Sequence, residues 1–415
     1  MKTHSVLPCF LTSTALFIGA LAPVVFGQGA LTPPGAPAPT MKTLTQVEPR
    51  TPISSLPYVI SSAGSYYLTT NLVSPGGIPG ITVAADHVTI DLRGFAIIGT
   101  GQFGGNYPAI TAPGPQVDLA VFNGSITLWS GEGVSAAFTK NSKLEELRVS
   151  TIGRSALHIG DGSLVNECMV QSNCSYAVGT PAIWVGNHCV VKACVAQGNS
   201  GPGISTGAGS VVAGCVANNN MNYGIVTGDE SKVTDCDALL NTISGNGPGD
   251  GIFVGYGGAV SGCVASGNAN DGIDTISGGS VLGCTVRTNM NNGIVVQYGS
   301  TVKDCTASAN HVNGIAVSLH SQVVGNTCDA NGNDGIAVGL AGDGNRIDGN
   351  SVTTNKVAGI DCSGSTADLV IRNSAHANGV NYSLNPAVGG TENATIFAPP
   401  GGNFMNPDPW GNFSY

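Results

Sequence analysis

Three carboxylates, Asp250, Asp271 and Asp274, stand in two adjoining repeats of the chain, close to aromatic side chains. Two carboxylates on adjacent coils could act as acid and base on a glycosidic bond, or could hold Ca²⁺ with water for a lyase that needs a uronate charge neutralised. Aromatic side chains beside them would suit the apolar face of a sugar, with the carboxylates orienting its hydroxyls. The aromatic candidates are Trp184, Tyr223, Phe253, Tyr256 and Tyr298.

The same residues also have a purely structural interpretation. Asp and Asn before Gly are common turn formers, and outward aromatic residues can simply cover a flat sheet. Two insertions, Cys174 to Thr180 and Thr242 to Gly247, fall at one corner of the repeat and could wall a cleft, because insertions in repeat proteins tend to flank the binding face. The functional interpretation expects Asp250, Asp271 and Asp274 to lie on the outward side of that corner.

The candidate residues lie in a part of the sequence that repeats with a fixed period, so a repeating structural unit must position their side chains. Gly-Ile pairs recur with steps of 21, 27, 21, 21, 21, 21 and 24 residues, so the irregular steps are the basic period plus an insertion. A period of about 20 to 25 residues is typical of a solenoid, in which each repeat packs only on its neighbours. The pairs begin at Gly203, Gly224, Gly251, Gly272, Gly293, Gly314, Gly335 and Gly359.

Aligning the repeats on these pairs produces three columns of uniform chemistry. One is cysteine for most of its length and asparagine from Asn326 onward, a second is valine or isoleucine, and a third is always asparagine. Val, Ile and Thr punctuated by Gly and Asn indicate strands and tight turns. The sequence therefore predicts an all-β parallel β-helix with coils of about 21 residues, a Cys/Asn interior column and an asparagine ladder. The ladder residues are Asn173, Asn199, Asn220, Asn241, Asn268, Asn289, Asn310, Asn331, Asn355 and Asn378.

The pattern Cys/Asn-x-Val/Ala-x-x-Asn-x-x-x-Gly-Ile-x-Val/Thr-x-Gly resembles that of right-handed parallel β-helix proteins of the pectin-lyase-like superfamily, including the bacterial secreted repeat group related to NosD. The segments "GSYYLTTNL" and "ITVAADHVTIDLRGFAIIG" look like the capping strand and first coils of such proteins. The resemblance covers about Asn71 to Asn378 and implies a right-handed solenoid of about eleven to thirteen coils.

The resemblance does not extend to the motifs of the superfamily's enzymes. The polygalacturonase signatures Asn-Thr-Asp, Asp-Asp, Gly-His-Gly and Arg-Ile-Lys are missing, and the columns around Asp250 and Asp274 lack the Arg or Lys that lyases of this fold use as base. We therefore expect a non-catalytic protein that faces carbohydrate or has a structural role in the envelope or at the surface. The alternative is a polysaccharide lyase or glycoside hydrolase acting on a uronic-acid-containing polymer, with Asp250, Asp271 and Asp274 as catalytic candidates. No cofactor is expected, apart from the Ca²⁺ that these carboxylates could bind.

The other residues with chemical potential have structural interpretations. Column cysteines should pack as small apolar groups, with parallel side chains that disfavour disulfides, whereas Cys174 and Cys189 lie off the column and could pair. The "GISTG" at Gly203 matches a serine-hydrolase motif only formally, because "GIVTG" at Gly224 shows that it is a repeat unit. The histidines share no column or metal spacing, so we interpret them as turn residues. They include His158, His188, His311, His320 and His376.

Composition and the chain ends limit the partners and the compartment. A net charge of −10 without a basic stripe argues against nucleic acid and anionic lipid as partners and favours a neutral or cationic one. The aromatic side chains beside carboxylates indicate a polysaccharide or cell-surface glycan as the candidate partner. Residues 1–27 are expected to be a signal peptide, or alternatively a buried helix, and no second apolar span follows, so we expect a secreted, periplasmic or cell-surface protein without a membrane span. The remaining domains are a Pro-rich linker (28–52), the β-helix with an N-terminal cap (53–378) and a C-terminal cap or tail (379–415), with a surface-sorting signal as the alternative for the tail.

Overall fold

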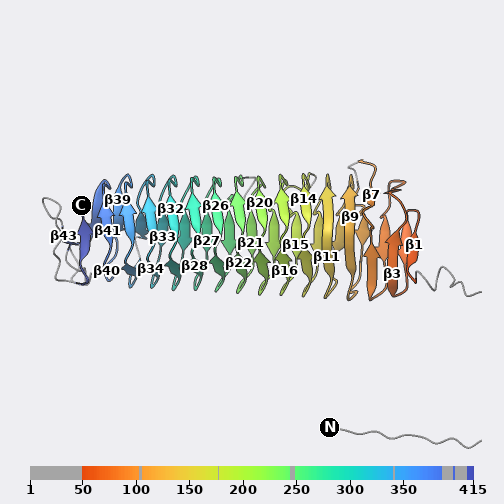
Figure 1. Ribbon diagram of the computed structural model, residues 1–415, viewed down its shortest axis with the longest axis horizontal. Helices are drawn as coiled ribbons and strands as arrows, with labels where there is room; N and C mark the ends of the chain where they lie inside the picture. The colour runs from red at the N-terminus through yellow and green to blue at the C-terminus, as the bar shows by residue number, and fades with distance from the viewer. Residues whose placement is uncertain are drawn as a thin grey trace, which may run out of the picture. The chain divides into compact units, whose positions relative to one another are not determined.

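Short parallel strands form where two buried residues flank one that faces outward, as in Ile225-Val226-Thr227. In this computed structural model the strands wind into coils that stack along one axis (Figure 1). The structure describes residues 49–101, 105–175, 177–243, 248–339, 342–385, 396–397 and 409–415. The expected signal peptide and residues 28–48 of the expected linker lie outside this part of the chain. Within the described residues, no helix is long and apolar enough to cross a membrane.

One strand from each coil contributes to sheet B, which has fifteen parallel strands in register. Ile225, for example, lies opposite Ile252 on the next coil. The strands of sheet B are β2 (Tyr58–Ile60), β5 (Ile81–Val83), β8 (Ile110–Thr111), β10 (Val134–Ala136), β12 (Leu157–Ile159), β15 (Ile183–Val185), β18 (Ile204–Thr206), β21 (Ile225–Thr227), β24 (Ile252–Val254), β27 (Ile273–Thr275), β30 (Ile294–Val296), β33 (Ile315–Val317), β36 (Ile336–Val338), β39 (Ala358–Cys362) and β42 (Val380–Leu384).

Sheet A contains the other twenty-nine strands, in two rows separated by a bend. The first row is β1 (Thr51–Ile53), β3 (Gly64–Leu68), β6 (Val88–Asp91), β13 (Leu164–Asn166), β16 (Val190–Lys192), β19 (Val211–Ala213), β22 (Lys232–Thr234), β25 (Ala259–Ser261), β28 (Ser280–Leu282), β31 (Thr301–Lys303), β34 (Gln322–Val324), β37 (Arg346–Asp348) and β40 (Leu369–Ile371). The strands β9 (Ala120–Thr127) and β11 (Lys143–Ser150) span both rows. The second row is β4 (Leu72–Val73), β7 (Ala96–Ile98), β14 (Met169–Gln171), β17 (Val195–Gln197), β20 (Val216–Asn218), β23 (Asp237–Leu239), β26 (Val264–Ser266), β29 (Thr285–Arg287), β32 (Thr306–Ser308), β35 (Thr327–Asp329), β38 (Ser351–Thr353), β41 (Ser374–His376), β43 (Ile396–Phe397) and β44 (Asn412–Ser414).

The predicted asparagine ladder is confirmed at the turn between the second row of sheet A and sheet B. The Nδ2 of Asn241 donates to Oδ1 of Asn268 at 2.9 Å and to the carbonyl of Ala217 at 3.0 Å. Its Oδ1 accepts hydrogen bonds from the backbone N–H and Nδ2 of Asn220 on the preceding coil. Each amide therefore satisfies polar groups of neighbouring coils that would otherwise be buried without partners.

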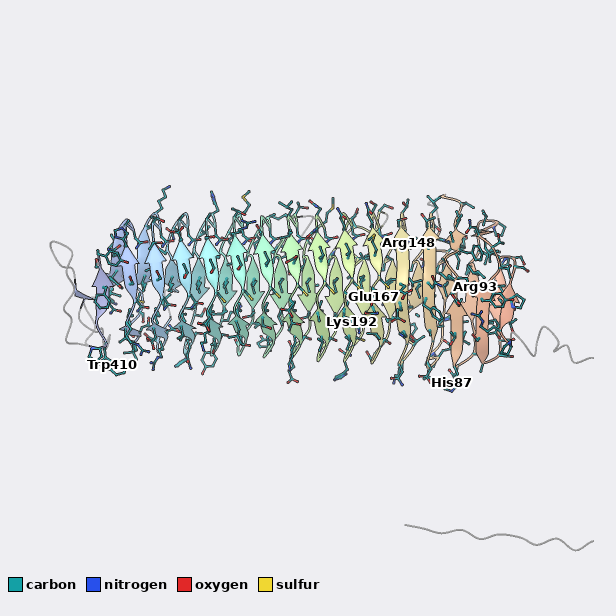
Figure 2. The ribbon with its side chains drawn as sticks, in the orientation of Figure 1. His87, Arg93, Arg148, Glu167, Lys192 and Trp410 are labelled. Atoms are coloured by element: carbon teal, nitrogen blue, oxygen red, sulfur yellow. The ribbon has the colours of Figure 1, made fainter. Side chains whose placement is uncertain are left out.

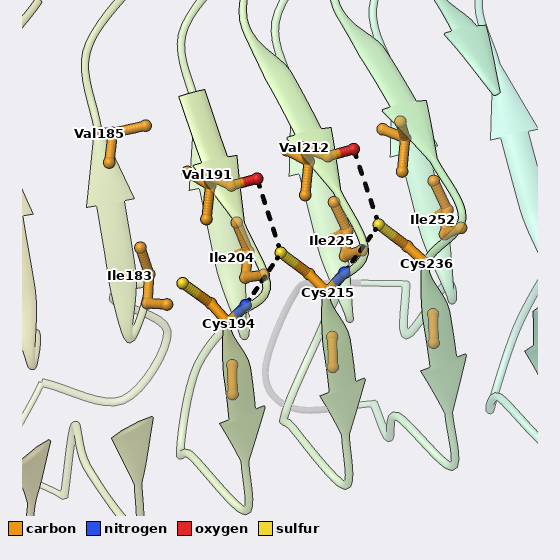
Figure 3. Packing of buried hydrophobic residues seen from close by; sticks show 14 of the residues in the cluster. Ile183, Val185, Val191, Cys194, Ile204, Val212, Cys215, Ile225, Cys236 and Ile252 are labelled. Atoms are coloured by element: carbon orange, nitrogen blue, oxygen red, sulfur yellow. Dashed lines mark hydrogen bonds between the residues drawn. The ribbon is translucent and has the colours of Figure 1, made fainter. Parts of the chain in front are cut away.

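The cysteine column lies inside the bend between the two rows of sheet A (Figure 3). The Sγ of Cys236 lies 3.4 Å from the donating backbone N–H of Cys215, and it donates in turn to the carbonyl of Thr234 at 3.1 Å. A hydrogen bond with the preceding thiol, together with burial, raises the pKa of Cys215 and Cys236 to about 12. The interior position is as predicted, but the thiols also act as hydrogen-bonding groups, which explains why Asn326 can continue the column. The described cysteines, Cys174 and Cys189 included, are free.

Regular coils extend beyond the range that the repeat pattern indicated. The expectation was about eleven to thirteen coils from Asn71 to Asn378, whereas sheet B has fifteen strands, from β2 to β42. The additional strands of sheet B are β2 and β42, which lie outside Asn71 to Asn378, and the first coils keep the buried alternation of Val and Ile without the cysteine and asparagine columns.

The C-terminal residues return to the last coils of sheet A. β44 pairs with β41, and Asn412 Oδ1 accepts a hydrogen bond from the backbone N–H of Asn373, so the Cys/Asn column gains one more member. Trp410 lies at this end of the solenoid, whereas His87 and Arg93 lie near its N-terminal end (Figure 2). The C-terminal strand thereby covers polar groups of the column that would otherwise end exposed.

Candidate functional site

The middle residues of the sheet B strands form one outward column, which we call the outer column. Each strand buries the residues on either side, so only this position of the strand faces outward. The alternation places Trp184, Phe253 and Asp274 on this face, as the sequence predicted. From β12 to β39 the outer column reads His158, Trp184, Ser205, Val226, Phe253, Asp274, Val295, Ala316, Ala337 and Asp361.

Aromatic and acidic side chains meet where β21, β24 and β27 begin. The rings of Tyr223 and Phe253 have centroids 5.6 Å apart and are tilted by 50°. Burial, with the charges of Asp250 and Asp274, raises the pKa of Tyr223. Together with Asp271, these residues form what we call the acidic-aromatic cluster.

The expectation that Asp250 and Asp271 point outward is wrong. Their exposed fractions are 1 % and 7 %, and their carboxylates belong to a second ladder at the turn before sheet B. Oδ1 of Asp250 accepts hydrogen bonds from the backbone N–H of Asp271 at 3.1 Å and from Asn270 Nδ2 at 2.6 Å. Oδ1 of Asp271 accepts from the backbone N–H of Asn292 at 2.8 Å. The residue before Gly-Ile lies in the turn and not on the strand, so the strand alternation does not apply to it.

Asp274 differs from these ladder carboxylates. It lies half-buried on β27, and its Oδ1 is buried without a hydrogen-bond partner among the described residues. Burial, with the charges of Asp250 and Asp271, raises the pKa of Asp274 to about 7, and burial raises that of Asp250 to about 6. Both carboxyl groups can therefore exchange protons near neutral pH, which is the range that acid–base chemistry needs.

The arrangement of Asp250, Asp271 and Asp274 does not favour the Ca²⁺ that these carboxylates could have held. Among the residues that the structure describes, no group of three or more His, Cys, Asp or Glu side chains is arranged to hold a metal ion. The oxygens of Asp271 accept hydrogen bonds from Asn292 and Asn270, so the ladder already uses them. Ca²⁺ prefers six to eight oxygen ligands, whereas the described oxygens of Asp250 and Asp271 already accept hydrogen bonds within the ladder.

Tyr256 and Tyr298 are not part of the cluster. They lie in the turns that follow β24 and β30, at the opposite end of the strands from Tyr223 and Asp250, and both are more than half exposed. Tyr298 contacts His320, with ring centroids 5.1 Å apart. Of the two insertions, residue 176 and residues 244–247 lie outside the described residues, whereas Thr242 pairs with Met221 beside the cluster.

Sequence reasoning missed the contacts that His158 makes in the outer column, on the N-terminal side of the acidic-aromatic cluster. His158 was expected in a turn, but it lies on β12, where its ring stacks on Trp184 at 4.2 Å and its Nδ1 lies 2.9 Å from Oε1 of Glu132. The sequence does contain a pattern that predicts this position of His158, because Leu157-His158-Ile159-Gly160 repeats the pattern of Ile183-Trp184-Val185-Gly186. The 26-residue step between them, which includes an insertion, concealed it.

The outer column also passes a shallow hollow towards the C-terminal end. It has a volume of about 220 Å³ and is lined by residues of β30, β33 and β36, including Val295, Ala316 and Ala337. Small side chains in the outer column leave room there, and Asn313 supplies a polar edge. A flat apolar floor with polar groups at its margin is typical of surfaces that bind sugar rings.

Comparison with known proteins supports the fold. The family described as "Right handed beta helix region" matches residues 240–327 and 283–397. No curated protein matches the chain significantly in sequence.

Solved structures with the same kind of solenoid are similar at low identity. The A-module of a mannuronan C-5 epimerase from Azotobacter vinelandii is 14% identical, with a TM-score of 0.46 over 80% of this chain and 91% of that chain. The periplasmic alginate epimerase AlgG is 14% identical, with a TM-score of 0.42 over 80% and 77%. PfbA, a surface adhesin of Streptococcus pneumoniae, is 10% identical, with a TM-score of 0.32 over 83% and 85%. At these identities the likeness concerns the fold.

Proposed function

We propose that this right-handed parallel β-helix protein, whose fold is of the pectin-lyase-like type, binds a glycan on the outer face of sheet B without cleaving it. The observation that carries the proposal is the acidic-aromatic cluster, where the Tyr223 and Phe253 rings lie beside the half-buried carboxyl group of Asp274 in the outer column. An aromatic ring covers the apolar face of a sugar, and a carboxylate accepts hydrogen bonds from its hydroxyls. The hollow beside Ala316 and Ala337 continues the same surface.

The charges of this face favour a neutral or amino-containing glycan over a polyuronate. None of the fifteen strands of sheet B carries a lysine or arginine, whereas Asp274 and Asp361 lie in the outer column. A uronate chain laid along this face would bring like charges together without a compensating cation. Sugar hydroxyls or an ammonium group would instead meet complementary acceptors.

Binding to a panel of neutral, amino-containing and uronate polysaccharides tests the proposal. We expect affinity for a neutral or amino-containing polymer, and a loss of about tenfold or more in Phe253→Ala and Asp274→Ala. Phe138→Ala is the matched control, because Phe138 is an exposed phenylalanine outside the outer column. The proposal fails if no polymer binds, or if the control weakens binding as much as Phe253→Ala does.

A second candidate is an acid–base enzyme at the same cluster. It is favoured by the raised pKa values of Asp250 and Asp274, which keep one carboxyl group available as acid and another as base near neutral pH. The release of reducing ends or of unsaturated products from the same panel, abolished by Asp274→Asn, would establish this candidate in place of binding alone.

Export is part of the proposal. The support is the apolar run after Lys2 and the small residues near Gly27, which are typical of a signal peptide. Mass spectrometry of the mature protein should find an N-terminus near Gln28. Retention of residues 1–27 in the mature protein would contradict export by this route.

A further inference from the structure

A stacked pair of rings, His158 and Trp184, stands in the outer column ahead of the acidic-aromatic cluster, and Glu132 contacts it from the coil before. The His158 and Trp184 rings lie face to face, with centroids 4.2 Å apart and planes within 3° of parallel. Oε1 of Glu132 lies 2.9 Å from Nδ1 of His158, and both side chains are mostly buried. Glu132 thus fixes the imidazole, and the imidazole covers one face of the indole.

Among the described residues, no second aromatic ring stacks on the other face of Trp184. His158 and Trp184 occupy consecutive coils, so the stack runs along the solenoid axis and the second indole face looks towards the next coil. Ser205 is the residue opposite Trp184 there, and its hydroxymethyl group is too small to cover an indole. Trp184 is 40 % exposed, whereas Trp129 in the core is 2 % exposed. Beyond Ser205 stands Val226, so in the outer column only the small side chain of Ser205 separates Trp184 from Val226, and we call this position the slot.

We infer that this slot is a second binding site, in which one pyranose ring of a neutral, β-linked hexose oligosaccharide stacks on the face of Trp184 away from His158. A pyranose with equatorial hydroxyls presents axial C–H groups to an aromatic ring and directs its hydroxyls to the sides. The Ser205 hydroxyl can donate to or accept from one of them. The Glu132–His158 pair holds the indole in place before the ligand arrives, which reduces the entropy lost on binding.

The site is distinct from the acidic-aromatic cluster and rests on the proposed function only for the class of ligand. Trp184 and Phe253 are three coils apart in the outer column, which corresponds to about 14 Å at the spacing of parallel strands. A long oligosaccharide can therefore occupy both sites, and a short one either site alone.

Tryptophan fluorescence isolates this slot, because the protein has three tryptophans and only Trp184 lies in the outer column. The probes are cellohexaose and chitohexaose, titrated into the full-length mature protein. The Trp184→Phe variant keeps an aromatic ring and supplies the background signal of Trp129 and Trp410. Ser205→Leu fills the slot and leaves Trp184 in place. Ser135→Leu is its matched control, because Ser135 lies on the other side of His158 in the same column.

We expect a saturable fluorescence change in the wild-type protein and in Ser135→Leu, and a loss of about tenfold or more in affinity in Ser205→Leu. The inference is overturned if neither probe changes the wild-type fluorescence, or if Ser205→Leu and Ser135→Leu respond alike. A response that survives in Ser205→Leu but disappears in Phe253→Ala would retain the proposed function and reject the slot.

Discussion

The interior asparagine ladder and Asp274 of the acidic-aromatic cluster have closely related side chains, but their hydrogen bonding differs. Asn241 bonds to Asn220, Asn268 and Ala217, so its amide is fully used within the solenoid. Asp274 has a buried oxygen without a partner among the described residues, and its neighbours in the column are Phe253 and Val295. Where the same polar residue recurs on every coil, its side chains bond to one another and hold the coils together. Where a single polar residue stands among unlike neighbours, as Asp274 does, its side chain is not used in this way.

The largest expected effect tests the structural side of this comparison. Asn241→Ala removes the acceptor of Asn220 and the donor to Ala217, and each buried group left unpaired costs about 1–3 kcal/mol. We expect a loss of roughly 3–5 kcal/mol in the free energy of unfolding, measured by urea denaturation followed by circular dichroism.

Asn219→Gly provides the matched control. Asn219 is exposed and has a φ of 53°, in a column where Gly198 and Gly267 have φ values of 61° and 66°. Its replacement should change stability by no more than about 0.5 kcal/mol. Equal losses in the two variants would show that the ladder position has no special importance.

The next prediction concerns the cluster and its pH dependence. The pKa of Asp274 rises from its ordinary value of 3.8 to about 7, so the folded protein retains a proton that the unfolded chain releases between these values. The contribution of Asp274 to stability is therefore lost as pH rises from about 4 to about 7. Asp274→Asn removes this loss and should stabilise the protein by roughly 1–3 kcal/mol at pH 8, and by much less at pH 4.

Urea denaturation of wild-type protein and Asp274→Asn across this pH range provides the measurement. The difference between the two curves should grow with pH and level off above about 7. A constant difference, or a variant less stable at pH 8, would contradict the assignment of Asp274 as a desolvated carboxyl group.

A third prediction tests whether thiol and amide are equivalent in the Cys/Asn column. The backbone N–H of Cys305 donates to Asn326 Oδ1, and the thiol of Cys305 accepts from the backbone N–H of Cys284. Cys305→Asn preserves both roles and should cost less than about 1 kcal/mol, whereas Cys305→Val leaves the N–H of Cys284 unpaired and should cost about 1–2 kcal/mol. Thermal unfolding of the two variants checks the order, and a more stable valine variant would show that the column is purely apolar.

The smallest expected effect concerns interior hydroxyls. Thr227 Oγ1 is buried without a hydrogen-bond partner in the described part of the chain, and Val254 occupies the same position on the next coil. Thr227→Val should therefore stabilise the protein by about 0.5–1 kcal/mol, seen as a higher Tm.

Thr139→Val is the contrasting variant for this prediction. Thr139 Oγ1 donates to the carbonyl of Ala136 at 2.8 Å and accepts from Ser142, so its loss should destabilise the protein. Two changes of the same sign would contradict the distinction between satisfied and unsatisfied hydroxyls.

Much of the fold follows from the sequence because every coil imposes the same requirements. A residue that must bond to its counterpart on the next coil recurs at each period, as Asn220, Asn241 and Asn268 do, so a single chain contains many independent copies of the same signal. The first coils lack the cysteine and asparagine columns, so the sequence contains fewer repeated residues there from which the strands could be predicted.

The candidate site depended on the tertiary structure for the opposite reason. Asp250 precedes a Gly-Ile pair and Asp274 follows one, and the structure places the first in a turn ladder and leaves an oxygen of the second without a partner among the described residues. His158 and Glu132 are 26 residues apart and meet only because two coils stack in register. Periodic columns can be read along a single chain, whereas burial, charge proximity and contacts between unlike residues depend on which coils lie side by side and how deeply each side chain is desolvated.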